Sequence, residues 1–430
     1  MKSIIEKNRS FLWGKKVLFG NPTQIKEIVN ILNTDKVVIL SGIRFAGKTK
    51  FLSEMIKKTG LWDKAFYFNK ELDTLGKVKT SEDLEKVLET YTTTYEEPRI
   101  IILHNINKIE DIKIFISKIY EEWKYKLIIV GNNLKIEWIQ EVEIKNTSTP
   151  KLLGLEEDKE KDIESIMKYG CIEEVALIRD IYMKNFLLED IKTSIIAKDI
   201  IYTYSIKNSF LYNQTLSFLS SIPSFISLRE FNRNLIDAWI EVSLITSIDY
   251  INYSLNSKLV KSMHSYDLKL DKEITSKVKY YFADTWLRNS IHGSDLSDDI
   301  LLENLVYNEL DKKGYTLHGW INGRFSFSFI GTPGTNMEDK DLYLHISKHS
   351  DKNEIQKEAR KLAKAGTYVK PIKIDTNILW EAPLWKNAIE KPSMKNIKRI
   401  LLVKDLDKVN MRKREIDWVQ VVDLYDYLAN

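Results

Sequence analysis

Eight residues near the N-terminus have the types and spacing of a phosphate-binding loop. The segment Gly42-Ile-Arg-Phe-Ala-Gly47-Lys48-Thr49 is a full match to the pattern G-x-x-x-x-G-K-[ST]. Glycines let consecutive backbone N–H groups curl around phosphate oxygens, and the N-terminus of a following helix adds positive charge. The lysine reaches the outer phosphates of a bound nucleotide, and the threonine hydroxyl binds magnesium. We therefore predict ATP or ADP binding with Mg²⁺, Thr49 being the metal contact, at Gly42, Ile43, Arg44, Phe45, Ala46, Gly47, Lys48 and Thr49.

A second segment, "RIIILHNINKI" from Arg99 to Ile109, ends where a hydrolytic enzyme needs acids. An acidic pair at that place holds magnesium and orients the attacking water. Here the two positions are His104 and Asn105, so we expect a packed histidine and an amide that can only hydrogen-bond. No arginine occurs between Arg99 and Arg179 to stabilise the transferring phosphoryl group. This pattern favours nucleotide binding with slow or absent hydrolysis.

The elements around these residues alternate between strand and helix. Apolar strands are predicted at 37–40, 64–69, 100–103 and 126–131, with helices after the loop and at 81–91 and 110–123. Such alternation is typical of a parallel sheet covered on both faces, which binds ligands at the carboxyl ends of its strands. Asn132 and Asn133 follow the last of these strands. Asn132 is either a contact to the terminal phosphate or part of an asparagine-rich turn.

Length and composition limit the alternatives. At 430 residues the chain is too long for one ordinary core. The 65 basic and 61 acidic residues leave a net charge of +4, which does not by itself imply nucleic acid. A single cysteine, Cys171, excludes an internal disulfide framework and any site with several cysteine ligands. We find neither a signal peptide nor a membrane span and expect a cytoplasmic protein.

The order of several further segments resembles a known family along nearly the whole chain. The segments are "SGIRFAGKT", "RIIILHNINKI", "IIVGNN", "KYGCIEEVAL", "SIIAKDIIYTYSI", "KVKYYFADTWLRNSIHG", "LLENLVYNELDKKGY", "QKEARKLAKA" and "WVQVVDLYDYL". They are similar to motifs of the prokaryotic AAA-type ATPases that carry a C-terminal restriction-endonuclease-like domain of unknown function. In this chain Phe45 replaces the family's second loop arginine, and the acidic pair is lost.

The resemblance implies an α/β protein of three domains. They are a P-loop parallel-sheet domain at 1–150, a helical and winged-helix domain at 151–275, and a degenerate restriction-endonuclease-like α/β domain at 276–430. In the middle, Ser227 and Glu230 have the spacing of a capping box at the start of a helix. A winged helix reads a DNA groove or only packs against its neighbours, and the few basic residues here favour packing.

The last third lacks the acids that a magnesium-dependent nuclease needs. Glu303 fits one acidic position of the resembled family, whereas Arg324 and Ser326 stand where others are expected, and Lys348 is near the place of a catalytic lysine. Magnesium requires several oxygen ligands, so we expect no nuclease activity and a salt-bridging or capping role for Glu303.

Basic residues are concentrated between 386 and 414, a segment that contains ten basic and three acidic residues. This segment is either a surface for nucleic-acid phosphates or a solvated face. Its candidate phosphate contacts are Lys395, Lys398, Arg399, Arg412, Lys413 and Arg414.

The leading hypothesis is a nucleotide-dependent switch or scaffold that binds a partner or nucleic acid through its C-terminal domain. A protein partner or a second copy of the chain is equally open as the ligand, and a membrane is not expected. One alternative is an active ATPase that takes its acid from Glu71, Asp73 or Glu110. Another is an interaction protein whose loop binds no nucleotide.

Overall fold

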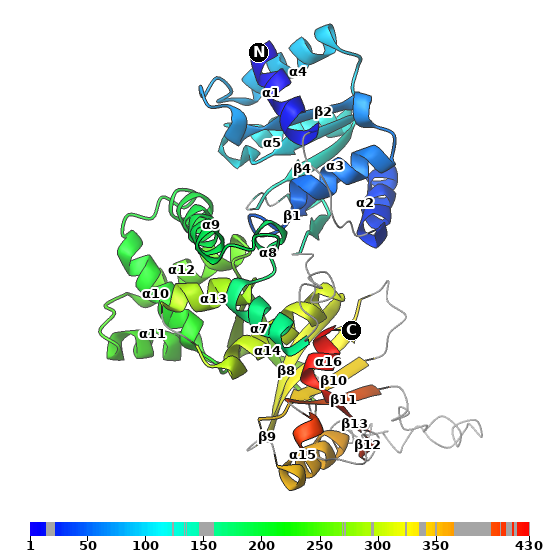
Figure 1. The fold of residues 1–430 in the computed structure, drawn as a ribbon. Coiled ribbons are helices and arrows are strands. Elements are labelled where there is room, and N and C mark those ends of the chain that lie inside the picture. The colour runs from blue at the N-terminus through cyan, green and yellow to red at the C-terminus, as the bar shows by residue number, and fades with distance from the viewer. Residues whose placement is uncertain are drawn as a thin grey trace, which may run out of the picture. The chain divides into compact units, whose positions relative to one another are not determined.

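The computed structural model describes the chain except for residues 14–21, 123, 133, 135, 146–158, 269, 271, 294–295, 323–324, 335–340, 349–350, 365–396, 405, 410–414, 417–418 and 430. The backbone folds into two compact units (Figure 1). Unit 1 comprises residues 1–147, 171–205 and 256–259, and unit 2 comprises 148–170, 206–255 and 260–430. None of the helices in the described part of the chain combines the length and the apolar character that crossing a bilayer requires.

Unit 1 is a five-stranded α/β layer structure. Its elements are α1 (Lys2–Trp13), α2 (Pro22–Thr34), β1 (Val37–Ser41), α3 (Lys48–Lys58), β2 (Ala65–Asn69), α4 (Ser81–Thr94), β3 (Ile100–His104), α5 (Ile112–Glu121), β4 (Lys126–Val130), β5 (Glu141–Glu143), α8 (Glu173–Ala176) and α9 (Ile181–Ser194). Short 3₁₀ turns lie at Trp62–Lys64, Lys70–Leu72 and Ile106–Lys108, and α9 continues into a π-helical segment at Ile195–Ile201.

The strands of unit 1 are paired in the order β2-β3-β4-β1-β5, and every pairing is parallel. The register sets Val38 opposite Ile128 and Ile101 opposite Leu127. One strand, β4, thus separates β1 from β3. Consequently the loop that follows β1 and the residues that follow β3 meet at the same edge of the sheet, with the end of β4 between them.

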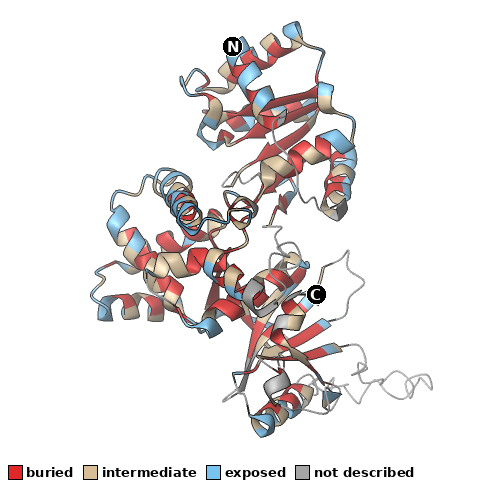
Figure 2. Ribbon diagram, viewed as in Figure 1, coloured by how far each residue is buried: buried red, intermediate tan, exposed pale blue. Residues whose placement is uncertain are grey.

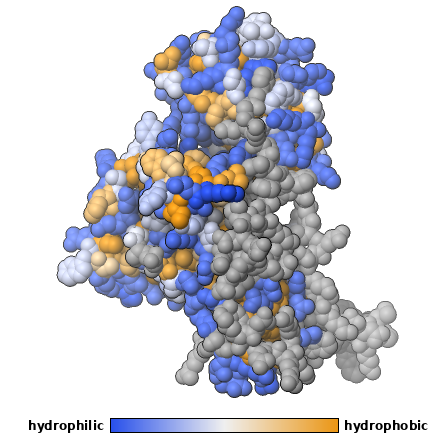
Figure 3. All heavy atoms as spheres, viewed as in Figure 1, coloured by the Kyte–Doolittle hydropathy of each residue, from blue (hydrophilic) through white to orange (hydrophobic). Residues whose placement is uncertain are grey.

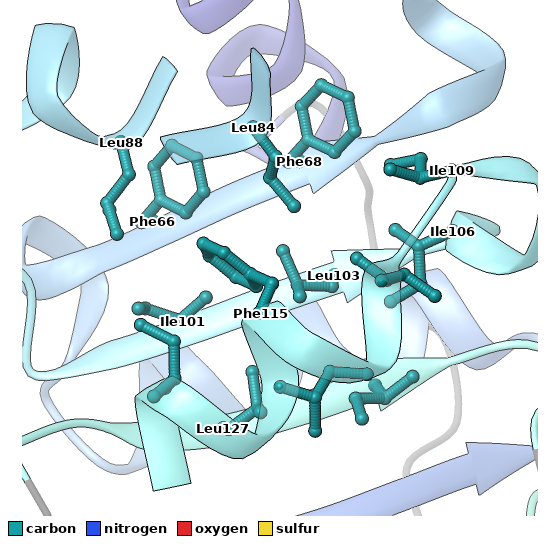
Figure 4. Close-up of a cluster of buried hydrophobic side chains, with 14 of the residues drawn as sticks. Phe66, Phe68, Leu84, Leu88, Ile101, Leu103, Ile106, Ile109, Phe115 and Leu127 are labelled. Carbon is teal, nitrogen blue, oxygen red and sulfur yellow. The ribbon is translucent and has the colours of Figure 1, made fainter. Parts of the chain in front are cut away.

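Successive strand residues bury on opposite faces of this sheet, which explains why its strands are apolar throughout (Figure 2). One face packs Phe66, Ile101 and Leu103 against α4 and α5, as the close-up in Figure 4 shows. The other face packs Val38 and Ile102 against α2 and α3. Each fully buried aliphatic or aromatic side chain contributes about 1.5–3 kcal/mol. The predicted parallel α/β sheet of the N-terminal region is confirmed.

Unit 2 contains helices and a larger, mixed sheet. Its elements are α7 (Lys159–Tyr169), α10 (Ser209–Ser221), α11 (Leu228–Asp237), α12 (Leu244–Asn256, whose last residue belongs to unit 1), β6 (Val260–Asp267), β7 (Lys272–Phe282), α13 (Thr285–His292), α14 (Asp298–Lys312), β8 (Tyr315–Asn322), β9 (Phe325–Pro333), β10 (Asp341–Ile346), α15 (Lys352–Lys364), β11 (Ile397–Val403), β12 (Glu415–Ile416), β13 (Val419–Asp423) and α16 (Leu424–Ala429).

The eight strands of unit 2 follow the order β12-β13-β11-β10-β9-β8-β6-β7. Strands β8, β9 and β10 form an antiparallel meander, and β11 then pairs with β10 in parallel after α15. At the other end, the antiparallel hairpin β6-β7 joins the sheet through β8. The hairpin follows the helices α10, α11 and α12, and an isolated bridge links Ile226 to Val278 of β7. The division into three domains stays a prediction, and β7 spans its second boundary at residue 275.

The predicted helix start at Ser227 is present. The Ser227 side chain accepts a hydrogen bond from the backbone N–H of Glu230 at 3.2 Å, and α11 begins at the next residue. A cap of this kind satisfies one of the N–H groups that the first turn of a helix leaves without an intrahelical partner.

Candidate nucleotide-binding site

The predicted phosphate loop connects β1 to α3. Its two glycines are required for different structural reasons. Gly42 has φ of 135°, and a Cβ added there would lie 2.2 Å from the backbone oxygen of Ile144. Gly47 has φ of 83° at the N-cap of α3, and an added Cβ would meet no atom within 4 Å. The first glycine therefore permits close packing against the chain after β5. The second permits a left-handed turn and leaves open space beside the helix N-terminus.

Lys48 is the first residue of α3, and its ammonium group folds back onto the loop. Its Nζ donates to the backbone oxygens of Gly42 at 2.6 Å and Ile43 at 2.8 Å. These carbonyls account for two of the three N–H donors of an ammonium group. Burial lowers the pKa of Lys48 to about 8, because desolvation disfavours its charged form. An anion beside Lys48 would favour its charged form, so the lysine suits a phosphate ligand.

A cavity of about 820 Å³ opens beside this loop. Among the residues singled out in the sequence, its lining includes Arg44, Phe45, Gly47, Lys48, Thr49, His104, Asn105 and Asn132. Gly42, Ile43 and Ala46 are buried behind it. The fold thus brings together the loop, the two positions that lost their acids and the end of β4, as the parallel sheet requires. The cavity, the helix N-terminus and the cationic side chains fit a nucleotide phosphate group.

His104 is a packed residue at the end of β3, as expected. It is 7% exposed, and its Nδ1 shares a hydrogen bond of 2.9 Å with the hydroxyl of Tyr67. Burial, and then the nearby charge of Lys48, lower the pKa of His104 to about 3. The imidazole is therefore neutral at physiological pH. It cannot replace the negative charge with which a carboxylate would hold magnesium.

Asn105 and Asn132 differ in backbone conformation and in their hydrogen bonds. Asn105 takes a left-handed conformation with φ of 56°, and its backbone N–H donates to Val130 at 2.9 Å. The Oδ1 of Asn132 accepts from the backbone N–H of Gly42 at 3.0 Å, and its Nδ2 donates to the Ser257 carbonyl at 2.9 Å. Asn132 thus fixes the start of the phosphate loop while lining the cavity. Asn133 lies outside the described residues.

Arg44 makes ion pairs that the sequence did not suggest. Its guanidinium lies 2.6 Å from Oε1 of Glu71 and 2.6 Å from Oδ1 of Asp199. Burial lowers the pKa of Arg44, but the hydrogen bonds to Glu71 and Asp199 outweigh it and raise the pKa above its ordinary value. The nearest sequence signal was "SIIAKDIIYTYSI", which contains Asp199 but does not say what the aspartate contacts. We refer to Arg44, Glu71 and Asp199 as the Arg44 cluster.

Two of the three alternative acids have structural partners. Asp73 accepts from the backbone N–H groups of Lys77 and Val78 and pairs with Lys70 at 2.8 Å. It therefore stabilises a turn. Glu71 belongs to the Arg44 cluster, and this pairing lowers its pKa against the opposing effect of burial. Glu110 is exposed and is not among the residues that line the cavity.

Lys108 and Tyr202 add a second contact at the cavity. The Lys108 ammonium lies 3.4 Å from the centroid of the Tyr202 ring, within the range of a cation–π interaction. Both residues line the cavity, as does Lys198. Within the described part of the chain, no group of three His, Cys, Asp or Glu side chains is placed to hold a metal ion.

Exposed apolar side chains gather on α9 and just after α8 in unit 1 (Figure 3). Leu177, Ile181, Tyr182, Met183 and Phe186 are between 58% and 87% exposed. Apolar patches of this kind mark interaction sites on many soluble proteins.

In unit 2, Glu303 forms an ion pair, as expected, and does not stand open to a metal. Its Oε1 lies 2.6 Å from Nζ of Lys279 and accepts from the Tyr281 hydroxyl at 3.0 Å. Burial lowers the pKa of Lys279, which makes the neighbouring carboxylate its necessary partner. Lys348 is exposed at the end of β10. The side chain of Ser326 and residue Arg324 lie outside what the structure describes.

The basic C-terminal candidates are only partly described. Lys398 is exposed on β11, whereas Arg399 is 3% exposed and lies over the ring of Tyr343 at 5.7 Å. Burial places Arg399 in the core rather than at a surface that a phosphate could reach. Lys395, Arg412, Lys413 and Arg414 lie outside the described residues.

In a comparison with known proteins, part of unit 1 matches a known family. Residues 34–143 match the sequence model of the family described as "AAA domain", a span from before the phosphate loop to the end of β5. These residues form an AAA-type, ATPase-like domain. The matched span lies within unit 1.

Two relatives extend along most of the chain. An uncharacterized protein of Haemophilus influenzae is 19% identical over 392 residues, which cover 84% of this chain and 96% of that protein. An uncharacterized protein of Methanocaldococcus jannaschii is 23% identical over 344 residues, which cover 70% of this chain and 75% of that protein.

Among solved structures, the Walker-type ATPase PABY2304 of Pyrococcus abyssi aligns with a TM-score of 0.41 and 11% identity, covering 63% of this chain and 95% of that one. The ORC1 protein of Aeropyrum pernix in complex with DNA aligns with a TM-score of 0.26 and 13% identity, covering 66% of this chain and 96% of that one.

Proposed function

We propose that this protein binds ATP or ADP with magnesium at the phosphate loop and hydrolyses ATP slowly or not at all. One observation carries the proposal: the loop cations line an open cavity, while the two places for acids hold a neutral histidine and an asparagine. The AAA-type match over residues 34–143 supports nucleotide binding. Lys48 would hold the outer phosphates, and the bound magnesium would offset their charge and orient them.

The slow rate follows from what the cavity lacks. A carboxylate after β3 would orient the attacking water, and neither neutral His104 nor Asn105 does so well. The alternative acids Glu71 and Asp73 are engaged by Arg44 and by a backbone turn. The protein is therefore better suited to a switch or scaffold than to rapid turnover. Its C-terminal part would serve as a binding platform for a partner or nucleic acid.

We further propose that unit 2 combines a winged-helix module with a degenerate restriction-endonuclease-like domain. Three helices followed by the hairpin β6-β7 support the first assignment. The order of α14, the meander β8-β9-β10, α15 and the parallel strand β11 supports the second. The pairing of β6 with β8 incorporates the hairpin into the larger sheet, which favours packing over DNA reading for the module.

A protein partner is favoured by one specific observation, the exposed apolar side chains on α9 and just after α8. Nucleic-acid phosphates would not bind such a surface, because they require cationic groups. The basic residues near Lys398 are the feature that favours nucleic acid.

Titration calorimetry with ATP and Mg²⁺ tests the central proposal. Lys48→Ala should weaken binding by the worth of a charge-assisted contact, about 1.5–3 kcal/mol. Lys58→Ala is a matched control at the other end of α3, where the lysine pairs with Glu54. Absence of binding to the wild type, or equal affinity for the wild type and Lys48→Ala, would contradict the proposal and support a structural protein.

A further inference from the structure

The Arg44 cluster joins three parts of unit 1 that are far apart in sequence. Arg44 belongs to the phosphate loop, Glu71 follows β2, and Asp199 lies in the π-helical segment after α9. Both carboxylates are held by two hydrogen bonds or more, with donor–acceptor distances between 2.6 and 3.1 Å. A planar guanidinium with two carboxylates is a strong and directional arrangement.

The cluster lies at the cavity rather than away from it. Arg44, Glu71 and Asp199 all line the cavity that Lys48 and Thr49 face. The charge of Arg44 acts on both Lys48 and His104. The side chain of Arg44 is 18% exposed, so it is reachable from the cavity without unfolding. A phosphate group at Lys48 would therefore lie in the same cavity as the Arg44 guanidinium.

Phosphate oxygens and carboxylate oxygens compete for the same guanidinium geometry. A nucleoside triphosphate brings one more phosphate, and more negative charge, into the cavity than a diphosphate. Resting on the nucleotide binding proposed above, we propose that Arg44 binds the terminal phosphate of a nucleoside triphosphate by exchanging Asp199 and Glu71 for phosphate oxygens. Arg44 is then the residue that distinguishes triphosphate from diphosphate.

The exchange has a structural consequence at residues 195–201. This segment is π-helical, a rare conformation that often occurs at functional sites. Asp199 ties it to the phosphate loop, and the Lys108–Tyr202 contact holds its end. Loss of the Arg44–Asp199 pair removes one of these two polar contacts, so we expect the segment to gain freedom when triphosphate binds. The segment continues directly from α9, whose first half carries exposed apolar side chains.

Two variants separate this role from a purely structural ion pair. Arg44→Met keeps an unbranched apolar side chain but removes the guanidinium, so the preference for ATP over ADP should fall about tenfold or more. Asp199→Asn weakens the competitor and leaves Arg44 in place, so the preference for ATP should rise. If the cluster only stabilises the fold, both variants change affinity in the same direction.

Hydrogen exchange of the backbone amides at residues 195–202 provides a readout independent of turnover. In the wild type, exchange should be faster with a non-hydrolysable ATP analogue and Mg²⁺ than with ADP. In Arg44→Met it should be fast with either nucleotide. Wild-type binding of ATP with no difference in exchange, or a fall in ATP preference for both variants, would overturn this inference and leave nucleotide binding intact. No wild-type binding of either nucleotide would overturn both.

Discussion

Lys48 and Arg44 in unit 1 and Lys279 and Arg288 in unit 2 are cations of similar type in different surroundings. The first two line an open cavity. Lys279 and Arg288 are instead buried, being 9% and 1% exposed, and Lys279 pairs with Glu303. A cation at a cavity can exchange partners with an anionic ligand. A cation enclosed by protein acceptors can only be lost at a cost in stability.

Arg288 shows how completely a buried cation can be satisfied. Its guanidinium donates to the backbone oxygens of Ser220 at 2.9 Å and Ile222 at 2.9 Å, and to Oδ1 of Asn304 at 3.1 Å. Asn304 in turn bonds both the N–H and the oxygen of Phe282. Burial lowers the pKa of Arg288 to about 10, which still leaves it charged at neutral pH. Arg288 and Asn304 thus form a buried polar network inside unit 2.

The largest effect we expect is on the stability of unit 2. Arg288→Ala removes the guanidinium donor from the buried carbonyls of Ser220 and Ile222 and from Asn304, and it should destabilise the unit by about 3 kcal/mol or more. The exposed Arg229→Ala should change stability by no more than about 0.5 kcal/mol. Hydrogen exchange of amides in α13 and α14 reports unit 2 alone. Equal protection in the two variants would show that the enclosed guanidinium is dispensable, and the comparison would fail.

Restoring the acidic pair in unit 1 tests whether the cavity lacks only its acids. The wild type should turn over ATP more slowly than the roughly 1 per second at which ordinary kinases begin. His104→Asp with Asn105→Glu should raise this rate by about 10²-fold or more, because a carboxylate can hold magnesium and orient water. His104→Asn with Asn105→Gln has nearly the same shape without charge and is the control. A wild-type rate in the ordinary range would instead support the active-enzyme alternative.

The sequence predicted the cavity's location better than its internal contacts. The loop motif, the apolar strands and the rule for the edge of a parallel sheet placed Lys48, His104 and Asn132 together, because these depend on local pattern. The pairing of Arg44 with Asp199 spans 155 residues in sequence, and nothing local specifies it. Likewise, nothing in the local sequence indicates that Arg288 is buried among backbone carbonyls. Contacts between distant elements were the part that pattern could not supply.

Acidification should affect His104 in a definite direction. Its pKa is about 3 in the fold against about 6.5 in an unfolded chain, so below pH 6.5 the unfolded state binds a proton that the folded state does not. Stability therefore falls as pH falls from 6.5 towards 3, by about 1.4 kcal/mol per pH unit. Denaturation of the wild type and His104→Gln between pH 7 and 5 measures the difference. Parallel pH profiles would show that His104 is solvated.

The smallest effect concerns two adjacent residues of β11, Lys398 and Arg399. Lys398 is a cation that a ligand can reach, whereas Arg399 is a buried cation. If nucleic acid binds this face, exposed Lys398 contacts a phosphate and releases a counterion, whereas Arg399, 3% exposed, contacts none. On duplex DNA, Lys398→Ala should lower the slope of log affinity against log salt by about 0.9. Arg399→Met should leave that slope unchanged and lower only stability. Fluorescence anisotropy at several salt concentrations measures both. A slope that falls equally in the two variants would mean that Arg399 reaches the surface, and no binding at low salt would leave a protein as the partner.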